Sequence, residues 1–268
     1  MAEQQARELT RVGSYEILGK LGEGKMTVVY QARDVRDGKT VALKIMRPEW
    51  THSVAFLKRF EREADAAESF DHPYLAKAYE HGEAEGYHFC ALELIEGEPL
   101  SDKLKRGETL TEAQALYVTR CIAEGLQYAW TRGIIHRDIK PGNIMIQTDS
   151  RIRLIDMGLA KSFNTGETTV TQAGAALGSA AYASPEQLEG KTDVDIRGDI
   201  YSLGLTLFHL TCGRQPFEGE SDAVVAVQNL SDPLPDPKMV NPKLSSAFST
   251  FVRKLAEKKP EKRYQTPA

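Results

Sequence analysis

Three polar side chains near the middle of the sequence have the types and spacing that metal-assisted phosphate chemistry requires. Asp138 is followed by Asn143 five residues later, and Asp156 comes thirteen residues after that. A carboxylate can orient an attacking hydroxyl group, and carboxylate and amide oxygens are the ligands that hard divalent cations prefer. The pattern therefore indicates phosphoryl transfer assisted by a bound metal ion.

Short apolar runs lie beside these three side chains and indicate how the chain presents them. We expect residues 134–135, 144–146 and 152–155 each to form a strand, because each is a β-branched or otherwise apolar run. Tight loops between short strands would direct the three polar side chains toward one place.

The pattern of apolar residues divides the chain into two parts. Residues 15–94 contain β-branched and aromatic runs separated by Gly and Asp turns, which predict strands, and one helix over residues 54–70. Further on, residues 112–133 and 199–213 predict two helices, the second of them buried because it is apolar nearly all round. Four prolines within residues 231–242 predict a segment without regular structure.

The composition excludes several classes of function. The chain has 268 residues and a net charge of -4, which gives no support to general nucleic-acid or membrane-surface binding. Three widely separated cysteines, Cys90, Cys121 and Cys212, predict buried thiols rather than a disulfide or metal site. No apolar run approaches the roughly 20 residues that span a bilayer, and no signal peptide is visible. We therefore expect a soluble, cytosolic domain. The closing Thr-Pro predicts entry into a further helix of a larger parent protein.

A glycine-containing turn lies between two of the predicted strands, at residues 21–30. Gly22 and Gly24 would let the backbone approach phosphate oxygens, because no Cβ intervenes. A plain β-hairpin is the alternative interpretation, since Gly-x-Gly turns are common.

Lys44 lies in a predicted strand between apolar neighbours, which indicates a buried ammonium group. Such a group needs an acidic partner. Glu61 and Glu63 in the predicted helix are the candidates, and they lie on different faces of that helix.

Taken together, these features resemble the catalytic domain of eukaryotic-type (Hanks-type) Ser/Thr protein kinases. The resemblance depends most on the string HRDIKPGN at residues 136–143 and the string DMG at residues 156–158, and it extends from residue 15 to residue 266. The strings HGEAEG, KPGNIMI and YASPEQ are most similar to the bacterial transmembrane sensor-kinase branch.

The resemblance implies an α+β, bilobal protein-kinase fold in a single catalytic domain over residues 1–268. A small β-rich N-lobe with one main helix would occupy about residues 15–94. A hinge would occupy about residues 93–98, and a larger helical C-lobe about residues 99–268.

The implied activity is that of an ATP-dependent protein Ser/Thr kinase, which transfers the γ-phosphate of Mg-ATP to Ser/Thr hydroxyls of protein substrates. Asp138 would orient the substrate hydroxyl, and Lys140 would contact the transferring phosphate. Asn143 and Asp156 would bind Mg2+, with Mn2+ as an alternative.

The resemblance assigns the remaining nucleotide contacts to the first half of the chain. Lys44 would hold the α- and β-phosphates, with Glu63 favoured over Glu61 because it alone fits the family's RFxREA pattern. Leu92 would guard the rear of the adenine pocket, while the Glu93 carbonyl and the Ile95 amide would bind the adenine edge. The other implied nucleotide contacts are Leu21, Gly22, Gly24, Val29, Ala42 and Met145.

Two positions depart from the family pattern. Thr27 stands where the family has a third glycine, and Met157 stands where it has Phe. They are the only support for a pseudokinase, a regulatory module that binds nucleotide without transferring phosphate. A small-molecule phosphotransferase is a third interpretation, but such enzymes usually lack a peptide-docking segment like Ser-Pro-Glu at residues 184–186.

Three further residues have implied structural roles. Glu186 would pair with Arg263, and Asp199 would hold the backbone of the catalytic loop. His136 would be a packing residue rather than a chemical one.

The polar stretch between Asp156 and Glu186 is predicted to be an activation loop that the enzyme itself phosphorylates. Thr171 is the first candidate for the modified residue and Thr169 the second, with Thr168 also considered. Arg137 and Lys161 would bind the added phosphate. The resemblance further implies a homodimer through the small lobe, and a cytoplasmic domain within a larger membrane protein.

Overall fold

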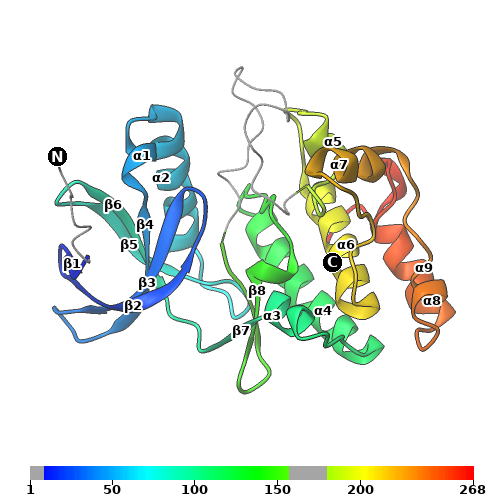
Figure 1. Ribbon diagram of the computed structural model, residues 1–268, viewed down its shortest axis with the longest axis horizontal. Helices are drawn as coiled ribbons and strands as arrows, with labels where there is room; N and C mark the ends of the chain where they lie inside the picture. Colours follow the sequence, from blue (N-terminus) through cyan, green and yellow to red (C-terminus); the bar gives the residue numbers. More distant parts are fainter. Residues whose placement is uncertain (1–8, 157–179) are drawn as a thin grey trace. The chain divides into compact units, whose positions relative to one another are not determined.

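The structure, a computed structural model, describes residues 9–156 and 180–268. These residues form two compact units (Figure 1). The first unit contains the described residues of 1–70 together with residues 77–95, and the second contains residues 71–76 and the described residues of 96–268. The first is dominated by a β-sheet and the second by helices, as expected of an α+β bilobal fold.

The first unit is built around an antiparallel sheet of six strands in the order β1-β2-β3-β4-β6-β5. Asp37 and Gly38 lie in the turn between β3 and β4, and Gly38 has a φ of +77°. The strands are β1 (Arg11–Val12), β2 (Tyr15–Glu23), β3 (Thr27–Asp34), β4 (Thr40–Met46), β5 (Ala78–Ala84) and β6 (Tyr87–Glu93), and the helices are α1 (Pro48–Thr51) and α2 (Val54–Glu68).

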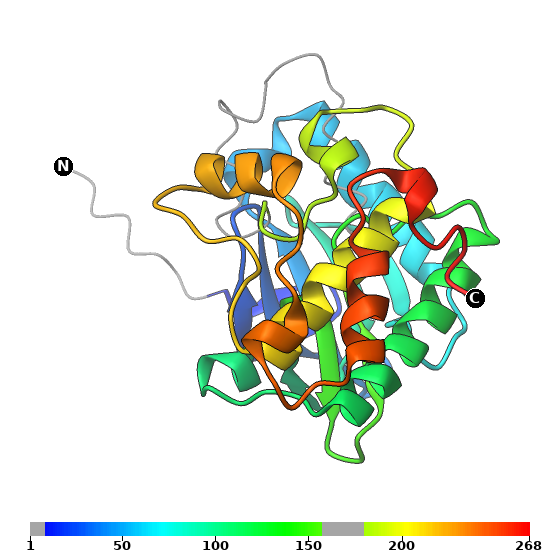
Figure 2. The same ribbon diagram turned by 90° about the vertical axis from the view of Figure 1, so that its right-hand side faces the viewer.

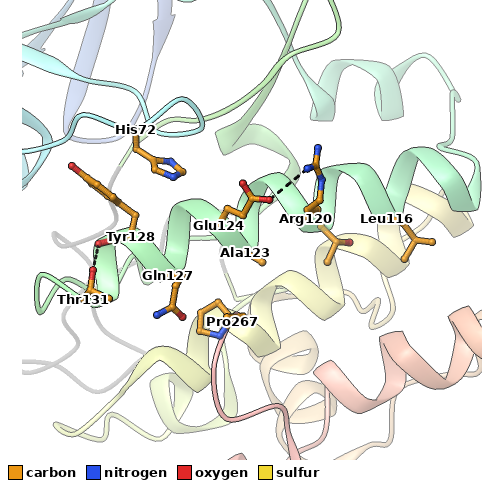
Figure 3. A pocket seen from close by; sticks show the side chains of 11 residues that line it. His72, Leu116, Arg120, Ala123, Glu124, Gln127, Tyr128, Thr131 and Pro267 are labelled. Carbon is orange, nitrogen blue, oxygen red and sulfur yellow. Dashed lines mark hydrogen bonds and ion pairs between the residues drawn. The ribbon is translucent and has the colours of Figure 1, made fainter.

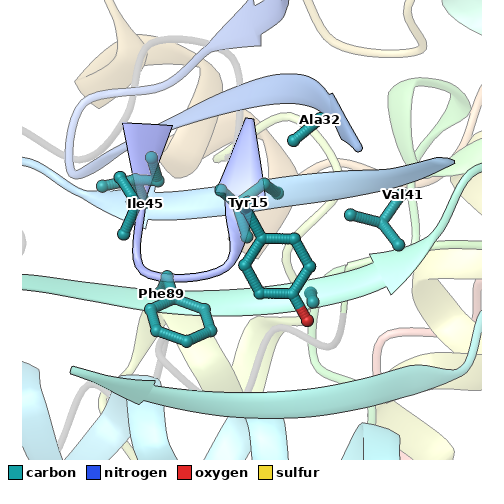
Figure 4. Close-up of a cluster of buried hydrophobic side chains, with 8 residues drawn as sticks. Tyr15, Ala32, Val41, Ile45 and Phe89 are labelled. Carbon is teal, nitrogen blue, oxygen red and sulfur yellow. The ribbon is translucent and has the colours of Figure 1, made fainter. Parts of the chain in front are cut away.

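The two faces of this sheet carry different side chains, because successive residues of a strand point to opposite faces. One face bears a buried apolar cluster that includes Tyr15, Val41 and Phe89 (Figure 4). On the other face, Met46 and Cys90 pack with α2 in a second apolar cluster. The second cluster seats α2 against the sheet.

The second unit contains a small antiparallel sheet in the order β7-β8-β9 and most of the helices. Its strands are β7 (Gly97–Pro99), β8 (Ile144–Gln147) and β9 (Ile152–Leu154). Its helical segments are α3 (Leu100–Lys105), α4 (Glu112–Trp130), η1 (Pro141–Asn143), α5 (Pro185–Leu188), α6 (Ile196–Cys212), α7 (Asp222–Ser231), α8 (Pro237–Val240), α9 (Ser246–Leu255) and η3 (Pro260–Lys262).

The two long helices predicted in this unit are present, with somewhat different ends: α4 ends at Trp130, and α6 already begins at Ile196. Thr111 caps α4 in a capping box with Gln114. Helix α6 is buried on nearly all sides and ends at Gly213, which has a φ of +74°. Helix α9 runs alongside α6 (Figure 2). A Cβ at Gly204 would lie 2.9 Å from the Cβ of Leu255, so the missing side chain permits this close packing.

Two predictions of local structure are wrong. Residues 134–135 are not a strand, because the amides that follow them bond to the side chain of Asp199 rather than to a neighbouring strand. The proline-rich stretch 231–242 contains the short helix α8. Asp236 caps it by accepting a hydrogen bond from the Lys238 amide, and Pro237 occupies the first turn, where its missing N–H costs nothing.

The predicted N-lobe also differs in one segment. Residues 71–76 group with the second unit because their backbone bonds to β9. The Leu154 amide donates to the Tyr74 carbonyl at 2.7 Å, and the Ala76 amide donates to the Leu154 carbonyl at 2.9 Å. The Asp71 amide is bound by the Tyr128 hydroxyl oxygen at 3.0 Å.

The described residues also test two expectations from composition. Across residues 9–156 and 180–268, no helix is both long enough and apolar enough to cross a bilayer. All three cysteines are free thiols. Cys90 and Cys121 are buried as predicted, whereas Cys212 is only partly buried, because it lies in the last turn of α6.

We predict that Gly97→Ala destabilises the protein. A Cβ at Gly97 would lie 2.3 Å from the backbone oxygen of Ile146 on β8, so the two strands would have to separate. We expect a loss of about 1–3 kcal/mol in unfolding free energy, as for other overpacked sites. Chemical denaturation measures it.

Gly82→Ala is the matched control. Its new Cβ would meet only the Phe89 ring, at 3.7 Å, an ordinary contact distance. We expect this variant to unfold within about 1 kcal/mol of the parent. Equal stability of the two variants would contradict the prediction.

Candidate functional site

The loop that follows α4 brings together three of the residues singled out in the sequence. The Lys140 ammonium group donates a hydrogen bond to Asp138 Oδ2 at 2.9 Å. The Asn143 side-chain amide donates to the same oxygen at 2.9 Å and to the Asp138 backbone carbonyl at 2.8 Å. Two donors on one oxygen favour the ionised form of the Asp138 carboxyl group. Asp138 therefore offers a fixed, anionic acceptor.

The backbone of this loop is held by Asp199, in the first turn of α6. Its two carboxylate oxygens accept hydrogen bonds from the amides of His136, at 2.8 Å, and Arg137, at 2.7 Å. Burial raises the pKa of Asp199 to about 7, and these two amide bonds oppose that shift. The predicted role of Asp199 as the anchor of the loop backbone is confirmed.

Arg137 has a strained backbone, with a φ of +66°. A non-glycine residue in this region is uncommon and costs of order 1–3 kcal/mol unless its surroundings impose it. Here Asp199 binds the Arg137 amide, and the side-chain amide of Gln187 donates to the Arg137 carbonyl at 3.0 Å. Both backbone polar groups of Arg137 are thus fixed from outside the loop.

Asp156 follows β9 and also has a left-handed backbone, with a φ of +61°. The amide of its neighbour Ile155 donates to the Asn143 carbonyl at 2.8 Å. This backbone hydrogen bond holds the segments that carry Asn143 and Asp156 together. The Asn143 amide nitrogen is already engaged with Asp138, which leaves its oxygen as the atom able to bind a cation. An amide oxygen and a carboxylate fit a hard divalent ion.

In the first unit, Lys44 on β4 contacts Glu63 on α2. Lys44 Nζ lies 2.9 Å from Glu63 Oε1, and both side chains are about nine-tenths buried. The structure thus contains the predicted pair and selects Glu63 over Glu61. A buried ammonium group without such a partner would be costly.

The apolar residues predicted to cover adenine share a face of the first unit's sheet. Val29 is the register partner of Lys44, and Ala42 is the register partner of Leu92. Because side chains alternate along β4, Ala42 and Lys44 point to the same side. Leu21, near the end of β2, is half-exposed. All of these residues remain partly accessible except Lys44.

The segment Ala180–Gly190 in the second unit is held by side chains from α6 and α7 and by Arg263, which follows η3. Glu186 forms a buried bidentate pair with Arg263, at 2.6 and 2.9 Å, as predicted. The Asn229 side-chain amide, on α7, donates to the carbonyls of Ala183, at 2.8 Å, and Ala180, at 3.2 Å. The Tyr182 hydroxyl is hydrogen-bonded to His209 Nδ1 on α6.

Several of these positioning residues were missed by sequence reasoning. The Gln187 contact had a readable signal, because Ser184 and Gln187 have the spacing of a capping box, and both capping bonds are present. Asn229 and His209 carried no comparable local pattern, since their partners are 46 and 27 residues away in sequence.

A pocket of about 670 Å3 lies along α4 in the second unit (Figure 3). Tyr128, Gln127 and Leu116 from α4 and Pro267 from the C-terminal segment are among its lining residues. No residue predicted to act in phosphoryl transfer lines it. We therefore do not assign this pocket to catalysis.

Some predicted residues lie outside the described residues. They are Met157, Lys161, Thr168, Thr169 and Thr171.

Comparison with known proteins places these features in one family. Residues 15–268 match the family described as the protein kinase domain. The chain is 36% identical over 254 residues to serine/threonine-protein kinase PrkC of Bacillus subtilis, and 38% identical over 259 residues to serine/threonine-protein kinase PknB of Mycobacterium tuberculosis. Each alignment covers 95% of this chain but only 39% and 41% of the relatives, so the chain spans about two fifths of their length.

A solved structure agrees with the fold. The crystal structure of the Mycobacterium tuberculosis PknI kinase domain is similar to this chain with a TM-score of 0.75 and 25% sequence identity. The match covers 96% of this chain and 93% of the other.

We predict that His209 contributes to acid lability of the fold. Burial lowers the pKa of His209 to about 4, whereas an unfolded histidine has a pKa near 6.5. Between these values the unfolded chain binds a proton that the folded chain excludes, so stability falls as the pH drops from about 6.5 to 4. His209→Gln should make this pH dependence shallower, by less than about 1 kcal/mol per pH unit because the ring is partly exposed.

Unfolding free energies measured at several pH values would test this expectation. His52→Gln, at an exposed histidine, serves as the control and should leave the slope unchanged. Parallel pH curves for His209→Gln and the parent would contradict it.

Proposed function

Because the chain belongs to the protein kinase domain family, we propose that it transfers the γ-phosphate of ATP to Ser or Thr hydroxyl groups of protein substrates. The observation that carries the proposal is the arrangement of Asp138, Lys140 and Asn143 around one carboxylate oxygen. A fixed anionic acceptor beside a cation is what this reaction needs at the attacking hydroxyl.

In this proposal each residue of the loop has a separate task. Asp138 accepts a hydrogen bond from the substrate hydroxyl and so orients a lone pair of the hydroxyl oxygen toward the phosphorus atom. Lys140, next to Asp138, supplies positive charge for the phosphate oxygens that become more negative during transfer. The bond from Asn143 to the Asp138 carbonyl keeps the loop closed around both groups.

Asn143 and Asp156 are the residues that would hold the divalent metal ion, which we take to be Mg2+. The ion would neutralise charge on the β- and γ-phosphates when nucleotide is bound. The left-handed backbone of Asp156 supports this role, since strained residues cluster at functional sites.

The first unit would supply the contacts to the rest of the nucleotide. Lys44, oriented by Glu63, would bind the α- and β-phosphates. The proposed adenine contacts are Leu21, Val29, Ala42, Leu92, Met145, the Glu93 carbonyl and the Ile95 amide. Gly22 and Gly24 would contact the phosphates.

A protein substrate is favoured over a small molecule by the segment that contains Ser184 and Glu186. The side chains of Asn229, His209 and Arg263 bind this segment, and its own Gln187 donates to the Arg137 carbonyl. Such a fixed segment would support an extended peptide bound beside it. We further propose a cytoplasmic location and, from the family resemblance, a homodimer.

We predict that Asp138→Asn lowers kcat about 10²- to 10⁴-fold, because it removes the anionic acceptor. Nucleotide binding should persist, since Asp138 is not among the proposed nucleotide contacts. Lys44→Met should also impair turnover, because the phosphates would lose their cation. Transfer of labelled phosphate to a generic protein acceptor measures both effects.

Asp149→Asn, an exposed carboxylate in the turn between β8 and β9, is the control and should retain kcat within about twofold. Turnover of Asp138→Asn within about tenfold of the parent would overturn the assignment. A parent protein that binds ATP without transferring phosphate would instead identify a pseudokinase.

Regulation by autophosphorylation is part of the same proposal. Among the described residues, the buried Arg137 Nε has no hydrogen-bond partner. Buried donors are nearly always satisfied, so this group calls for an acceptor. A phosphate on Thr171, or second on Thr169, would provide a doubly charged one.

We predict that Thr171→Ala lowers activity roughly tenfold, the loss of about one charge-assisted hydrogen bond. Arg137→Ala should remove much of the gain from phosphorylation. Mass spectrometry after incubation with Mg-ATP locates the phosphate, with Asp138→Asn as the inactive reference and Thr148→Ala as an exposed-threonine control. An active enzyme without phosphate anywhere in residues 165–171 would end this part of the proposal.

A further inference from the structure

Three successive carbonyl groups of the glycine-containing turn accept hydrogen bonds from residues between the end of β4 and α1. We call this region the corner of the first unit. The Gly24 carbonyl accepts from Arg47 Nε at 3.0 Å. The Lys25 carbonyl accepts from the Trp50 indole N–H at 3.2 Å. The Met26 carbonyl accepts from the Arg47 backbone amide at 2.9 Å.

This turn needs support from outside itself. It is internally closed by one backbone bond, from the Gly24 amide to the Thr27 carbonyl at 2.8 Å. Lys25, at its tip, is exposed to solvent. Carbonyl oxygens carry partial negative charge and would repel phosphate oxygens if they turned toward them. Donors from Arg47 and Trp50 hold three of these carbonyls toward the corner.

Trp50 is itself anchored in the apolar cluster that seats α2. Its ring packs edge-on against Phe56, with the centroids 4.7 Å apart. It also packs against the cluster that contains Met46, Phe60 and Ala64. Since α2 carries Glu63, the same cluster positions both the turn and the Lys44–Glu63 pair.

Surface charge pairs at this corner contribute little by comparison. Arg47 also bonds Glu23 at 2.8 Å, but the Glu23 side chain is 54% exposed. Exposed ion pairs contribute weakly because water and salt screen them. The Lys25 ammonium group lies 5.9 Å from the Trp50 ring centroid, at the long end of the range for a cation–π contact. The bonds to the carbonyls are therefore the specific restraint.

We propose that Arg47 and Trp50 are positioning residues that hold the glycine turn in its phosphate-binding shape. This inference rests on the proposed kinase function for its effect on ATP, whereas the restraint on the turn is a property of the chain alone. Thr27, which replaces the third glycine of the family pattern, fits a turn that is held in place rather than one that is free to adapt.

Trp50→Phe is the informative substitution, because it keeps an aromatic ring beside Phe56 while it removes the indole N–H together with part of the ring. We expect KM for ATP to rise about 3- to 10-fold with kcat within twofold, the pattern for loss of binding that is uniform between ground and transition states. Arg47→Gln should have a similar effect through Gly24. Glu23→Gln is the control and should leave both constants within twofold.

A second measurement needs no nucleotide. Trypsin cleaves the bond after Lys25, and the carbonyl of that bond is the one that Trp50 holds. Cleavage there should be several-fold faster in Trp50→Phe and in Arg47→Gln than in the parent. Cleavage after Lys39, an exposed residue in the turn between β3 and β4, is the internal reference and should not change. Melting temperatures confirm that each variant is folded.

The two measurements separate the inference from the proposed function. If the parent neither binds ATP nor transfers phosphate, the proposed function fails, and cleavage after Lys25 still decides whether Arg47 and Trp50 restrain the turn. If Trp50→Phe and Arg47→Gln, both folded, are cleaved after Lys25 at the parent rate, the inference is overturned. Unchanged KM in an active enzyme would overturn its link to ATP.

Discussion

The conformation of the candidate catalytic loop depends on one buried carboxylate. Asp199 accepts hydrogen bonds from two successive amides, those of His136 and Arg137. These bonds offset the cost of burying the carboxylate and also hold Arg137 in a backbone region that it would otherwise avoid. Asp138 is the next residue, so the direction of its side chain follows from this restraint. An Asn at position 199 would present an N–H to one of the two amides and lose half of the restraint.

Buried charged side chains also fix the chain at two other places, where each has a partner of opposite charge. Lys44 with Glu63, and Glu186 with Arg263, are buried ion pairs that join segments far apart in sequence. Buried pairs often add little net stability, because desolvation costs about as much as attraction gains, but breaking one leaves a charge uncompensated. Their effect is to make one arrangement of the chain much better than its alternatives. Each pair holds a segment to which the proposed function assigns a task.

Sequence reasoning reached the features that depend on local pattern or on a strong motif. The existence of α4, the buried character of α6 and the pairing of Lys44 with Glu63 followed from apolar periodicity and family pattern. It failed where a distant side chain decides the local structure. Residues 134–135 look like a strand, yet the amides that follow them have a partner on α6 more than 60 residues away. Asn229 gave no signal, because its two carbonyl partners belong to another segment.

Residues 71–76 carry a consequence for how the chain can be divided. This short segment leaves the first unit after α2, bonds to β9 of the second, and returns to the first at β5. The first unit is therefore not a continuous stretch of sequence. In a fragment ending near residue 95, the backbone groups of Tyr74 and Ala76 would lose their partner Leu154, and in the complementary fragment this edge of β9 would be unpaired. A cut between the two units at any single position of the chain would therefore separate residues that belong to the same unit.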